Sequence, residues 1–181
     1  MNSQQPGRVE LVVPTVRLAE SWREARDEWP AEVVREGTPL RPVTDLSTDE
    51  GFAAWVHALC AQADELRRPA EGMVHATHWW ITDGERYLGA IDLRHYLNGF
   101  LLHAGGQIGY SIRPSARGQG LATWALGQVL GRARERGLEK VLLTCDEGNL
   151  ASRKVIERNG GVLEDVRQTS IGLKRRYWIA C

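Results

Sequence analysis

The chain has 181 residues, and its 23 Lys and Arg are balanced by 23 Asp and Glu, so its formal net charge is zero. That length suits one domain with a sizeable core, and the charge balance gives no support for a nucleic-acid or anionic-membrane partner. The first residues lack a secretion-signal pattern, and no apolar run approaches the roughly 20 residues of a membrane span. Three cysteines at unrelated spacings suggest neither a disulfide framework nor a metal site. We therefore expect a soluble, cytoplasmic protein with reduced thiols.

The first third of the chain contains one strand pattern and two helix patterns, separated by a proline-rich segment. Residues 1–8 are expected to be disordered, and 9–13 reads as a strand. Apolar residues then recur with helical spacing from Leu18 until Pro30 ends the helix. Three prolines predict a long loop over 30–46. The capping box "STDE" at 47–50 begins a second helix, whose apolar face is formed by Phe52, Trp55, Val56, Leu59 and Cys60.

The rest of the chain alternates strands and helices. "HWWITDGERYLGAIDLRHY" predicts a hairpin around Asp83-Gly84, and a further strand covers 107–112. A buried-type strand at 140–145 lies between helices predicted over 121–136 and about 149–159. "GVLEDV" and "RRYWIA" follow as two closing strands. This order predicts a mixed α/β fold with one central mixed sheet and a crossover within it.

Strand alternation also applies to the tryptophan pair Trp79-Trp80 in the predicted hairpin. Successive side chains of a strand point to opposite faces of the sheet. One of the two tryptophans is therefore expected to face away from the core.

The stretch "SIRPSARGQGLATWAL", residues 111–126, joins a strand to a helix that has no capping side chain at its start. The first four N–H groups of a helix have no partner within it, and the helix dipole places partial positive charge there. Gly118 and Gly120 remove side chains, so that an anion could approach the backbone, and Arg117 adds a positive charge. The pattern predicts a phosphate cradle. A plain glycine-containing turn is the alternative explanation.

Two better-known phosphate motifs do not match this stretch. The Rossmann motif requires Gly or Ala where Thr123 stands and an acidic residue about 20 positions further on. The P-loop requires Gly-Lys-Ser/Thr, and no such tripeptide follows. A cradle here is therefore of another kind.

Further spacings give this cradle a family resemblance. The pattern Val/Ile-x-Pro-x-x-Arg-Gly-x-Gly/Ala, followed by a helix, a strand and Asn-x-x-Ser opening a helix that ends in Asn-Gly-Gly, resembles the GNAT acyltransferase superfamily. The matching residues are Ile112, Pro114, Arg117, Gly118, Gly120, Ala122, Asn149, Ser152 and Gly160-Gly161. "IDLRHYLN", "GQIGYSIRPSARGQG", "LLTCDEGNLASRKVIERNGG" and "RYWI" extend the match to a family of predicted bacterial acetyltransferases. The resemblance covers most of 79–179, whereas the N-terminal third matches only in the order of its elements.

The resemblance implies a fold and a co-substrate. It implies one acetyltransferase domain over 1–181, with a central mixed, twisted sheet, splayed parallel strands and flanking helices. Within it, 14–78 would form the helical region on the acceptor side. It also implies acetyl-CoA as acyl donor and no metal. Metal binding at His75 and His78 is not expected from the sequence either, because no further ligand follows at a recognisable spacing.

The resemblance also implies which residues bind acetyl-CoA. In such enzymes the diphosphate lies on the loop and helix start, and the pantetheine pairs with the preceding strand, entering a gap where that strand splays from the next parallel one, here 141–146. A backbone N–H near Ile112 would polarise the thioester carbonyl. The implied cofactor-binding residues are Tyr110, Ser111, Ile112, Arg117, Gly118, Gln119, Gly120, Leu121, Ala122, Thr123, Asn149 and Ser152. Asn149 also fits an ordinary helix N-cap.

The catalytic acid and base do not carry over from the family. Many relatives have a general-acid Tyr seven residues after the Asn, where this chain has Ile156. Relatives that acetylate protein N-termini have a Glu five residues before the Asn, where this chain has Thr144. The local candidates are Asp146, Tyr110 and His95. Each has a structural alternative: Asp146 and its neighbour Glu147 could complement a helix dipole, Tyr110 could pack in the core, and His95 could be an ordinary structural histidine.

These observations predict an acetyl-CoA-dependent N-acetyltransferase. Its acceptor would be a small amine, an amino-acid-like molecule or a peptide amine that attacks directly in a ternary complex. One alternative is a CoA-binding module without turnover, which Ile156 and Thr144 make credible. Another is an O-acetyltransferase, which would need a base such as His95 within reach of the acceptor. Nucleic acid and membranes are not expected partners, and pairing of two chains through their closing strands is left open.

Overall fold

The computed structural model describes residues 9–30 and 45–181. The terminal segment predicted to be disordered and most of the predicted proline-rich loop lie outside the described residues. The chain forms two compact units, each built from separate segments. The first unit contains the described chain up to Arg68 together with 77–92 and 110–121. The second contains 69–76, 93–109 and 122–181.

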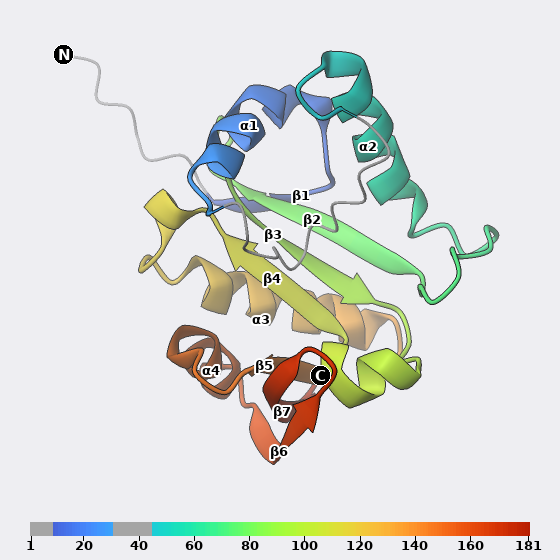
Figure 1. Cartoon of the computed structure of the whole chain (residues 1–181), viewed down its shortest axis with the longest axis vertical. Helices are drawn as coiled ribbons and strands as arrows, with labels where there is room; N and C mark the ends of the chain where they lie inside the picture. Colours follow the sequence, from blue (N-terminus) through green and yellow to red (C-terminus); the bar gives the residue numbers. More distant parts are fainter. Residues whose placement is uncertain (1–8, 31–44) are drawn as a thin grey trace. The chain divides into compact units, whose positions relative to one another are not determined.

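The order of the long elements follows the prediction: strand, two helices, three strands, helix, strand, helix and two strands (Figure 1). Three short helical turns add to these. The elements are β1 (Glu10–Val12), η1 (Val16–Leu18), α1 (Ala19–Asp27), α2 (Asp49–Ala61), β2 (Ala76–Thr82), β3 (Tyr87–Arg94), η2 (Leu101–Gly105), β4 (Ile108–Ile112), η3 (Pro114–Ala116), α3 (Leu121–Glu135), β5 (Lys140–Asp146), α4 (Leu150–Arg158), β6 (Val162–Thr169) and β7 (Gly172–Ala180).

The strands form two sheets, with the orders β1-β2-β3-β4 and β5-β7-β6, instead of the single central sheet that the sequence predicts. β1 pairs antiparallel with β2, and β7 pairs antiparallel with both β5 and β6. Gln107, just before β4, donates its N–H to Leu142 O of β5 at 2.6 Å. After Gly109, β4 continues into the first unit, whereas β5 lies within the second.

The core of the first unit is aromatic. Helices α1 and α2 cover the same face of the strands β1–β3 (Figure 1). The ring centroids of Trp22 and Trp55 lie 4.8 Å apart, and Trp80 meets Tyr87 edge-on at 5.4 Å. Phe52 on α2 contacts both Trp22 of α1 and Trp80 of β2. The apolar helical stripes predicted from the sequence are thus confirmed as core, except at Cys60, which is exposed although the prediction placed it on the apolar face of α2. Each aromatic pair adds about 0.5–1.5 kcal/mol beyond its buried area.

Trp79 and Trp80 are both buried, with 7% and 0% of their surface exposed. The prediction that one of them faces away from the core is therefore wrong. Their side chains alternate across β2, but nearly every residue of β2 and β3 is buried. A sheet that is covered on both faces buries both members of such a pair.

The start of α2 differs by one residue from the predicted capping box. The hydroxyl of Thr48, and not that of Ser47, accepts the backbone N–H of Gly51 at 3.1 Å. Ser47 instead donates its hydroxyl to Asp45 at 2.7 Å. Thr48 fills the cap because its backbone is extended, as an N-cap requires.

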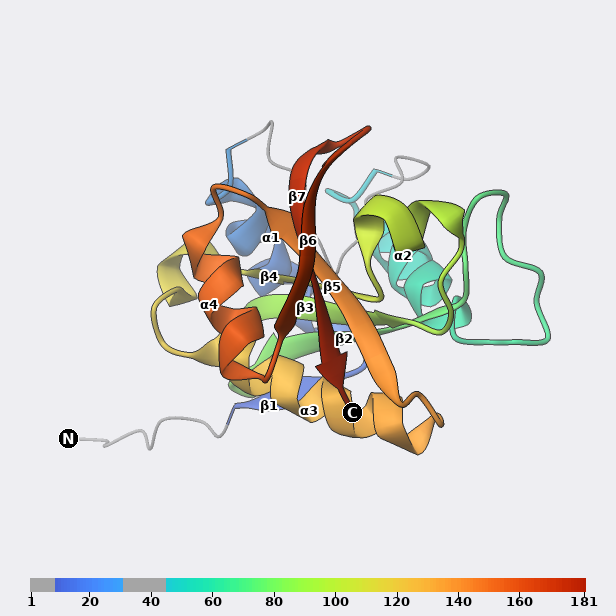
Figure 2. The same cartoon turned by 90° about the horizontal axis from the view of Figure 1, so that it is seen from below.

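The second unit contains the β5-β7-β6 sheet, with α4 beside it (Figure 2). Arg176 on β7 is buried, forms ion pairs with Glu164 and Asp165 of β6, and donates to Leu102 O at 2.8 Å. Thr144 donates its hydroxyl to Ala104 O at 2.7 Å. Side chains of the sheet therefore donate hydrogen bonds to backbone carbonyl groups of η2, which is a π-helical turn. Among the described residues, no helix is both long and apolar enough to cross a membrane.

Candidate functional site

The predicted cradle follows β4 as an exposed loop, residues 117–120, here called the phosphate loop. It connects η3 to the first residue of α3, Leu121. Gly118 and Gly120 both have φ of +78°, which costs other residues about 1–2 kcal/mol. A Cβ atom built on either glycine meets no other atom within 4 Å. The positive φ therefore favours glycine at both positions, and the missing side chains leave open space beside the backbone.

The start of α3 has the chemistry of an anion site. The four residues before it are Arg, Gly, Gln and Gly, so no short polar side chain stands at the N-cap. Helix geometry leaves the first N–H groups without an intrahelical acceptor, at the positive end of the dipole. Arg117 adds charge beside the loop. Its Nε lies 3.3 Å from Ile112 O and its Cζ lies 4.6 Å from the centre of the Trp29 ring. The loop therefore fits a bound diphosphate.

The strand before this loop has the form of a ligand-pairing edge. β4 is the last strand of the order β1-β2-β3-β4, so one of its sides is an edge of that sheet. Such an edge offers backbone groups to an extended ligand. Ser111 is buried, whereas Tyr110 and Ile112 are half-buried. The structure thus brings eight predicted cofactor residues into one unit, namely Tyr110, Ser111, Ile112, Arg117, Gly118, Gln119, Gly120 and Leu121.

Asn149 and Ser152 lie in the second unit, as do Ala122 and Thr123. The side-chain oxygen of Asn149 accepts the backbone N–H of Ser152 at 3.0 Å, so Asn149 is the N-cap of α4. The structural alternative for Asn149 is therefore confirmed. Contact of these two residues with a cofactor stays a prediction.

The candidate acid and base residues have different surroundings. Asp146 is exposed at the end of β5 and forms an ion pair with Lys174, which lies opposite it on β7. His95 is buried, and its Nδ1 accepts a hydrogen bond from Arg136 at 3.0 Å, because a guanidinium can only donate. His95 also stacks on His75, with ring centroids 6.2 Å apart. Each of the two is thus held by a cation.

Two positions where relatives carry catalytic groups are structural in this chain. Ile156 has 0% of its surface exposed. The Thr144 hydroxyl donates a hydrogen bond to Ala104 O. Among residues 9–30 and 45–181, no cluster of three or more His, Cys, Asp and Glu side chains could hold a metal ion.

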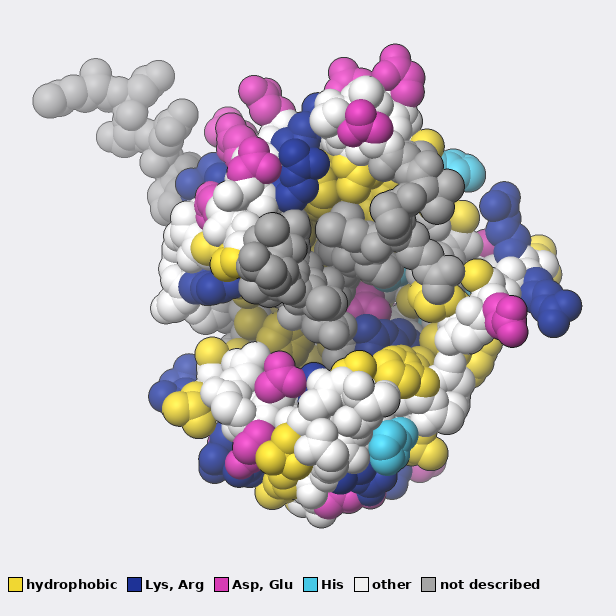
Figure 3. All heavy atoms as spheres, viewed as in Figure 1, with side chains coloured by type: hydrophobic (Ala, Val, Ile, Leu, Met, Phe, Trp, Pro, Cys, Tyr) yellow, Lys and Arg dark blue, Asp and Glu magenta, His cyan; other side chains and the backbone are white. Residues whose placement is uncertain are grey.

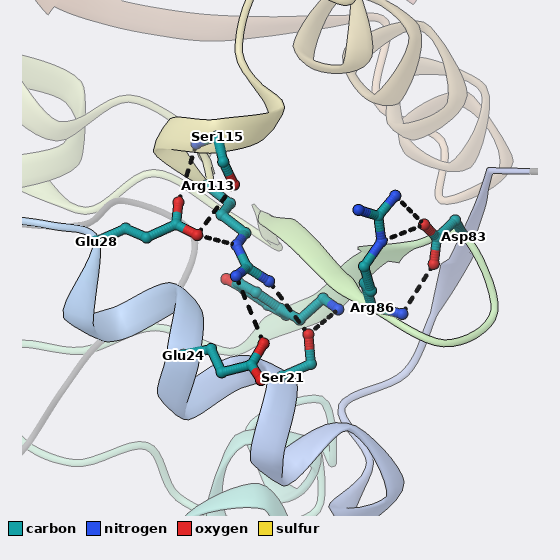
Figure 4. Close-up of polar contacts among 8 residues, drawn as sticks. Ser21, Glu24, Glu28, Asp83, Arg86, Arg113 and Ser115 are labelled. Atoms are coloured by element: carbon teal, nitrogen blue, oxygen red, sulfur yellow. Dashed lines mark hydrogen bonds and ion pairs between the residues drawn. The ribbon is translucent and has the colours of Figure 1, made fainter.

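The structure adds a polar cluster that the sequence analysis missed. Glu28, at the C-cap of α1, accepts hydrogen bonds from Arg113 Nε at 2.5 Å and from Ser115 N at 2.9 Å (Figure 4). Partial burial would raise the pKa of Glu28, but the hydrogen bonds from Ser115 and Arg113 outweigh it and hold that pKa below its ordinary value. The one signal in the sequence was an acidic residue at a helix C-terminus, where the dipole disfavours it.

Comparisons with known proteins agree with this geometry. Residues 17–162 match the family model described as an acetyltransferase (GNAT) domain. No curated protein sequence is significantly similar to the chain.

Solved structures of the same fold include RimJ of Mycobacterium smegmatis in complex with CoA-disulfide. It has a TM-score of 0.72 and 19% identity, with 97% of this chain and 83% of that chain covered. The microcin C7 self-immunity acetyltransferase MccE, in complex with acetyl-CoA and AMP, has a TM-score of 0.67 and 16% identity, with 96% and 92% covered. A Salmonella typhimurium acetyltransferase that modifies the N-terminal serine of ribosomal protein L7/L12 has a TM-score of 0.65 and 17% identity, with 96% and 95% covered.

Proposed function

The chain belongs to the GNAT acetyltransferase family, and from that premise we propose that it acetylates the amine of a small molecule, an amino-acid-like compound or a peptide. It is an acyltransferase that uses acetyl-CoA as acyl donor. The family match at 17–162 includes residues of both units, which supports one acetyltransferase domain over 1–181.

The observation that carries the proposal is the bare phosphate loop before α3. Its two glycines leave open space beside the backbone, and Arg117 supplies a positive charge. We assign binding of the CoA diphosphate to 117–123. Tyr110, Ser111 and Ile112 would offer the strand edge to the pantetheine, with an N–H near Ile112 polarising the thioester carbonyl. Asn149 and Ser152 would contact the cofactor from α4.

The acceptor amine must lose a proton before it attacks, because an alkylammonium has a pKa near 10. Asp146 and His95 are the candidate bases, and Tyr110 is the candidate acid that would protonate the departing CoA thiolate. The carboxylate of Asp146 is engaged by Lys174, and the Nδ1 lone pair of His95 is engaged by Arg136. Tyr110 lies on β4 and is half-buried.

Two observations favour an amine as acceptor. Exposed acidic side chains gather over α1 and the start of α2 (Figure 3). They include Glu20, Glu24 and Glu50, together with Asp27 and Asp49, which pair with Arg26 and Arg23. A negative surface raises the local concentration of a cationic amine. The Salmonella typhimurium enzyme, which shares the fold, modifies an N-terminal serine, and its acceptor is therefore also an amine.

A CoA-binding module without turnover is the second candidate function. The buried Ile156 and the engaged hydroxyl of Thr144 favour it, because relatives carry catalytic groups at these two positions.

A calorimetric titration with acetyl-CoA, with CoA for comparison, tests the cofactor site. We expect saturable binding in the micromolar range or tighter. Gly120→Glu should abolish it, because a carboxylate would occupy the anion site. Gly137→Glu is the matched control: Gly137 has φ of +80°, also with open space around it, but follows the other end of α3. Absence of binding by the wild type at millimolar cofactor would overturn the assignment.

A screen for thiol release over amines separates the two functions. An acetyltransferase releases CoA thiol only when an acceptor is present. A binding module would bind acetyl-CoA with the same affinity and release none with any acceptor. Release with alcohols and not with amines would indicate an O-acetyltransferase.

A further inference from the structure

The connection between β4 and the phosphate loop is attached at both of its ends to the end of α1. At the first end, Glu28 accepts from Arg113 and from Ser115, as Figure 4 shows. At the other end, the guanidinium of Arg117 lies over the Trp29 ring. Glu28 and Trp29 are consecutive residues, so the end of α1 contacts both ends of the connection between β4 and the phosphate loop.

The Glu28–Arg113 contact is a strong one. The side chains of Arg113 and Glu28 are only 12% and 25% exposed. Arg113 also lies 3.3 Å from Ser21 Oγ, to which its Nη1 donates. Charge-assisted hydrogen bonds that are partly shielded from water are stronger than surface ion pairs. Arg86, whose side chain is 68% exposed, forms such a surface pair with Asp83 at the β2–β3 turn.

The charge of Glu28 is not stabilised by the helix to which it belongs. Glu28 caps the C-terminus of α1, where the dipole opposes a negative charge. The carboxylate of Glu28 is stabilised instead by a residue far away in the sequence, because it accepts the N–H of Ser115 in η3. The N-cap residue of η3, Arg113, makes no side-chain capping hydrogen bond. Glu28 therefore caps η3 from α1.

A restraint of this kind matters for a glycine-containing loop. Gly118 and Gly120 give the loop many backbone conformations, and a ligand that binds must select one of them. The ordering cost is subtracted from the binding free energy. Contacts that fix residues 113, 115 and 117 in the free protein reduce that cost.

We propose that Glu28 and Trp29 form a clamp that positions the phosphate loop for the diphosphate of CoA. Glu28 is a positioning residue: its carboxylate acts on the ligand only through Arg113 and Ser115. This inference rests on the proposed function, since the anion is that of the acyl donor. The clamp makes cofactor affinity depend on the end of α1.

The test is calorimetric titration of Glu28→Gln with three ligands. Glutamine keeps the shape of the side chain and loses the charge. CoA and 3′-phosphoadenosine 5′-diphosphate both carry the diphosphate, and we expect each to bind about tenfold more weakly. Pantetheine lacks the diphosphate, and its affinity should not change. A defect spread through the whole fold would weaken all three.

Two further variants complete the design. Arg86→Gln removes the surface ion pair at the β2–β3 turn and should leave all three affinities at the wild-type values. Arg113→Gln should reproduce the loss of affinity seen in Glu28→Gln. The double variant should lose no more affinity than either single one, because the Glu28–Arg113 contact that positions the loop is broken by both changes. Arg113→Lys, a milder change, serves if a glutamine variant fails to fold.

The outcomes separate the two proposals. Wild-type affinity for CoA in Glu28→Gln, or an equal loss for pantetheine, would overturn the clamp and leave the cofactor site intact. Additive losses in the double variant would overturn it as well. If the wild-type protein bound neither CoA nor 3′-phosphoadenosine 5′-diphosphate, the proposed function itself would fail.

Discussion

Glu28 shows how a single residue can be unfavourable in its own helix and favourable in the fold. Its charge opposes the dipole of α1, and its hydrogen bonds with Arg113 and Ser115 more than compensate. Asn149 is the opposite case, because its side chain stabilises its own helix by accepting the backbone N–H of Ser152 at the start of α4. For both residues, the hydrogen-bond partners of the side-chain polar atoms account for the residue type at that position.

The stability that Glu28 contributes should depend on pH in one direction. Its folded-state pKa is held below the ordinary value of 4.5, so the contribution is complete above pH 4.5 and is lost as the pH falls through the folded-state pKa. Urea unfolding should show Glu28→Gln less stable than wild type by about 1–2 kcal/mol at pH 7, with the difference vanishing at low pH. Glu24→Gln should have a smaller effect, because the side chain of Glu24 is 58% exposed. A difference that grew on acidification would contradict this assignment.

Substitutions of Asn149 can separate its two roles. Serine also caps helices, so Asn149→Ser should keep stability near the wild-type value, whereas Asn149→Ala should lose about 1 kcal/mol. If the amide also contacts the cofactor, both variants should bind CoA more weakly. Chemical denaturation and titration of the same samples measure the two effects. Wild-type CoA affinity in Asn149→Ser would leave Asn149 with the capping role alone.

At the scale of elements, the three long helices that follow loops begin differently. α2 is capped by Thr48 and α4 by Asn149. α3 begins after Arg-Gly-Gln-Gly, whose two glycines have positive φ. The helix start without a short polar side chain at its N-cap is the one to which we assign the proposed anion site.

The cap of α2 provides a test at this scale. Thr48→Ala should destabilise the protein by about 1 kcal/mol, because the Gly51 N–H loses its acceptor. Ser47→Ala removes only the bond to Asp45 in the turn before the helix and should cost less. Thermal unfolding of the two variants side by side measures the order. A larger loss for Ser47→Ala would mean that the helix begins one residue earlier.

At the scale of the whole molecule, each unit has its own interior. The first is centred on aromatic rings, whereas the second contains a buried arginine that links β7 to β6 and to η2. The division into units passes through β2, β3 and β4, each of which has residues in both. Neither unit is therefore a continuous piece of the chain.

Replacing the buried arginine should be the most destabilising of these changes. Arg176→Met leaves Glu164 and the Leu102 carbonyl without their partner, and we expect a loss of about 3 kcal/mol. For a protein of this size that is a fall in Tm of about 6–12 °C. Arg167→Met is the control, since Arg167 shares Asp165 with Arg176 but its side chain is 37% exposed. Equal shifts in Tm would show that burial does not decide the cost.

The sequence by itself determined the order of the elements, the helical stripes that form the core and the phosphate loop. These follow from local rules: side-chain periodicity selects helix or strand, and glycines before a helix start without a capping side chain predict an anion site. The apolar faces of α1 and α2 were predicted for this reason. The resemblance to the GNAT family added the acyl donor, because its motif consists of residue types at fixed spacings along the sequence.

Only the tertiary structure decided the contacts made between distant segments. The burial of both Trp79 and Trp80, the division into two sheets and the clamp at Glu28 depend on residues far apart in the chain. Glu28 and Arg113 are 85 positions apart, and no periodicity or spacing relates residues at that distance. Hydrogen bonds and ion pairs depend on geometry within a few ångströms, which the fold of the whole chain sets.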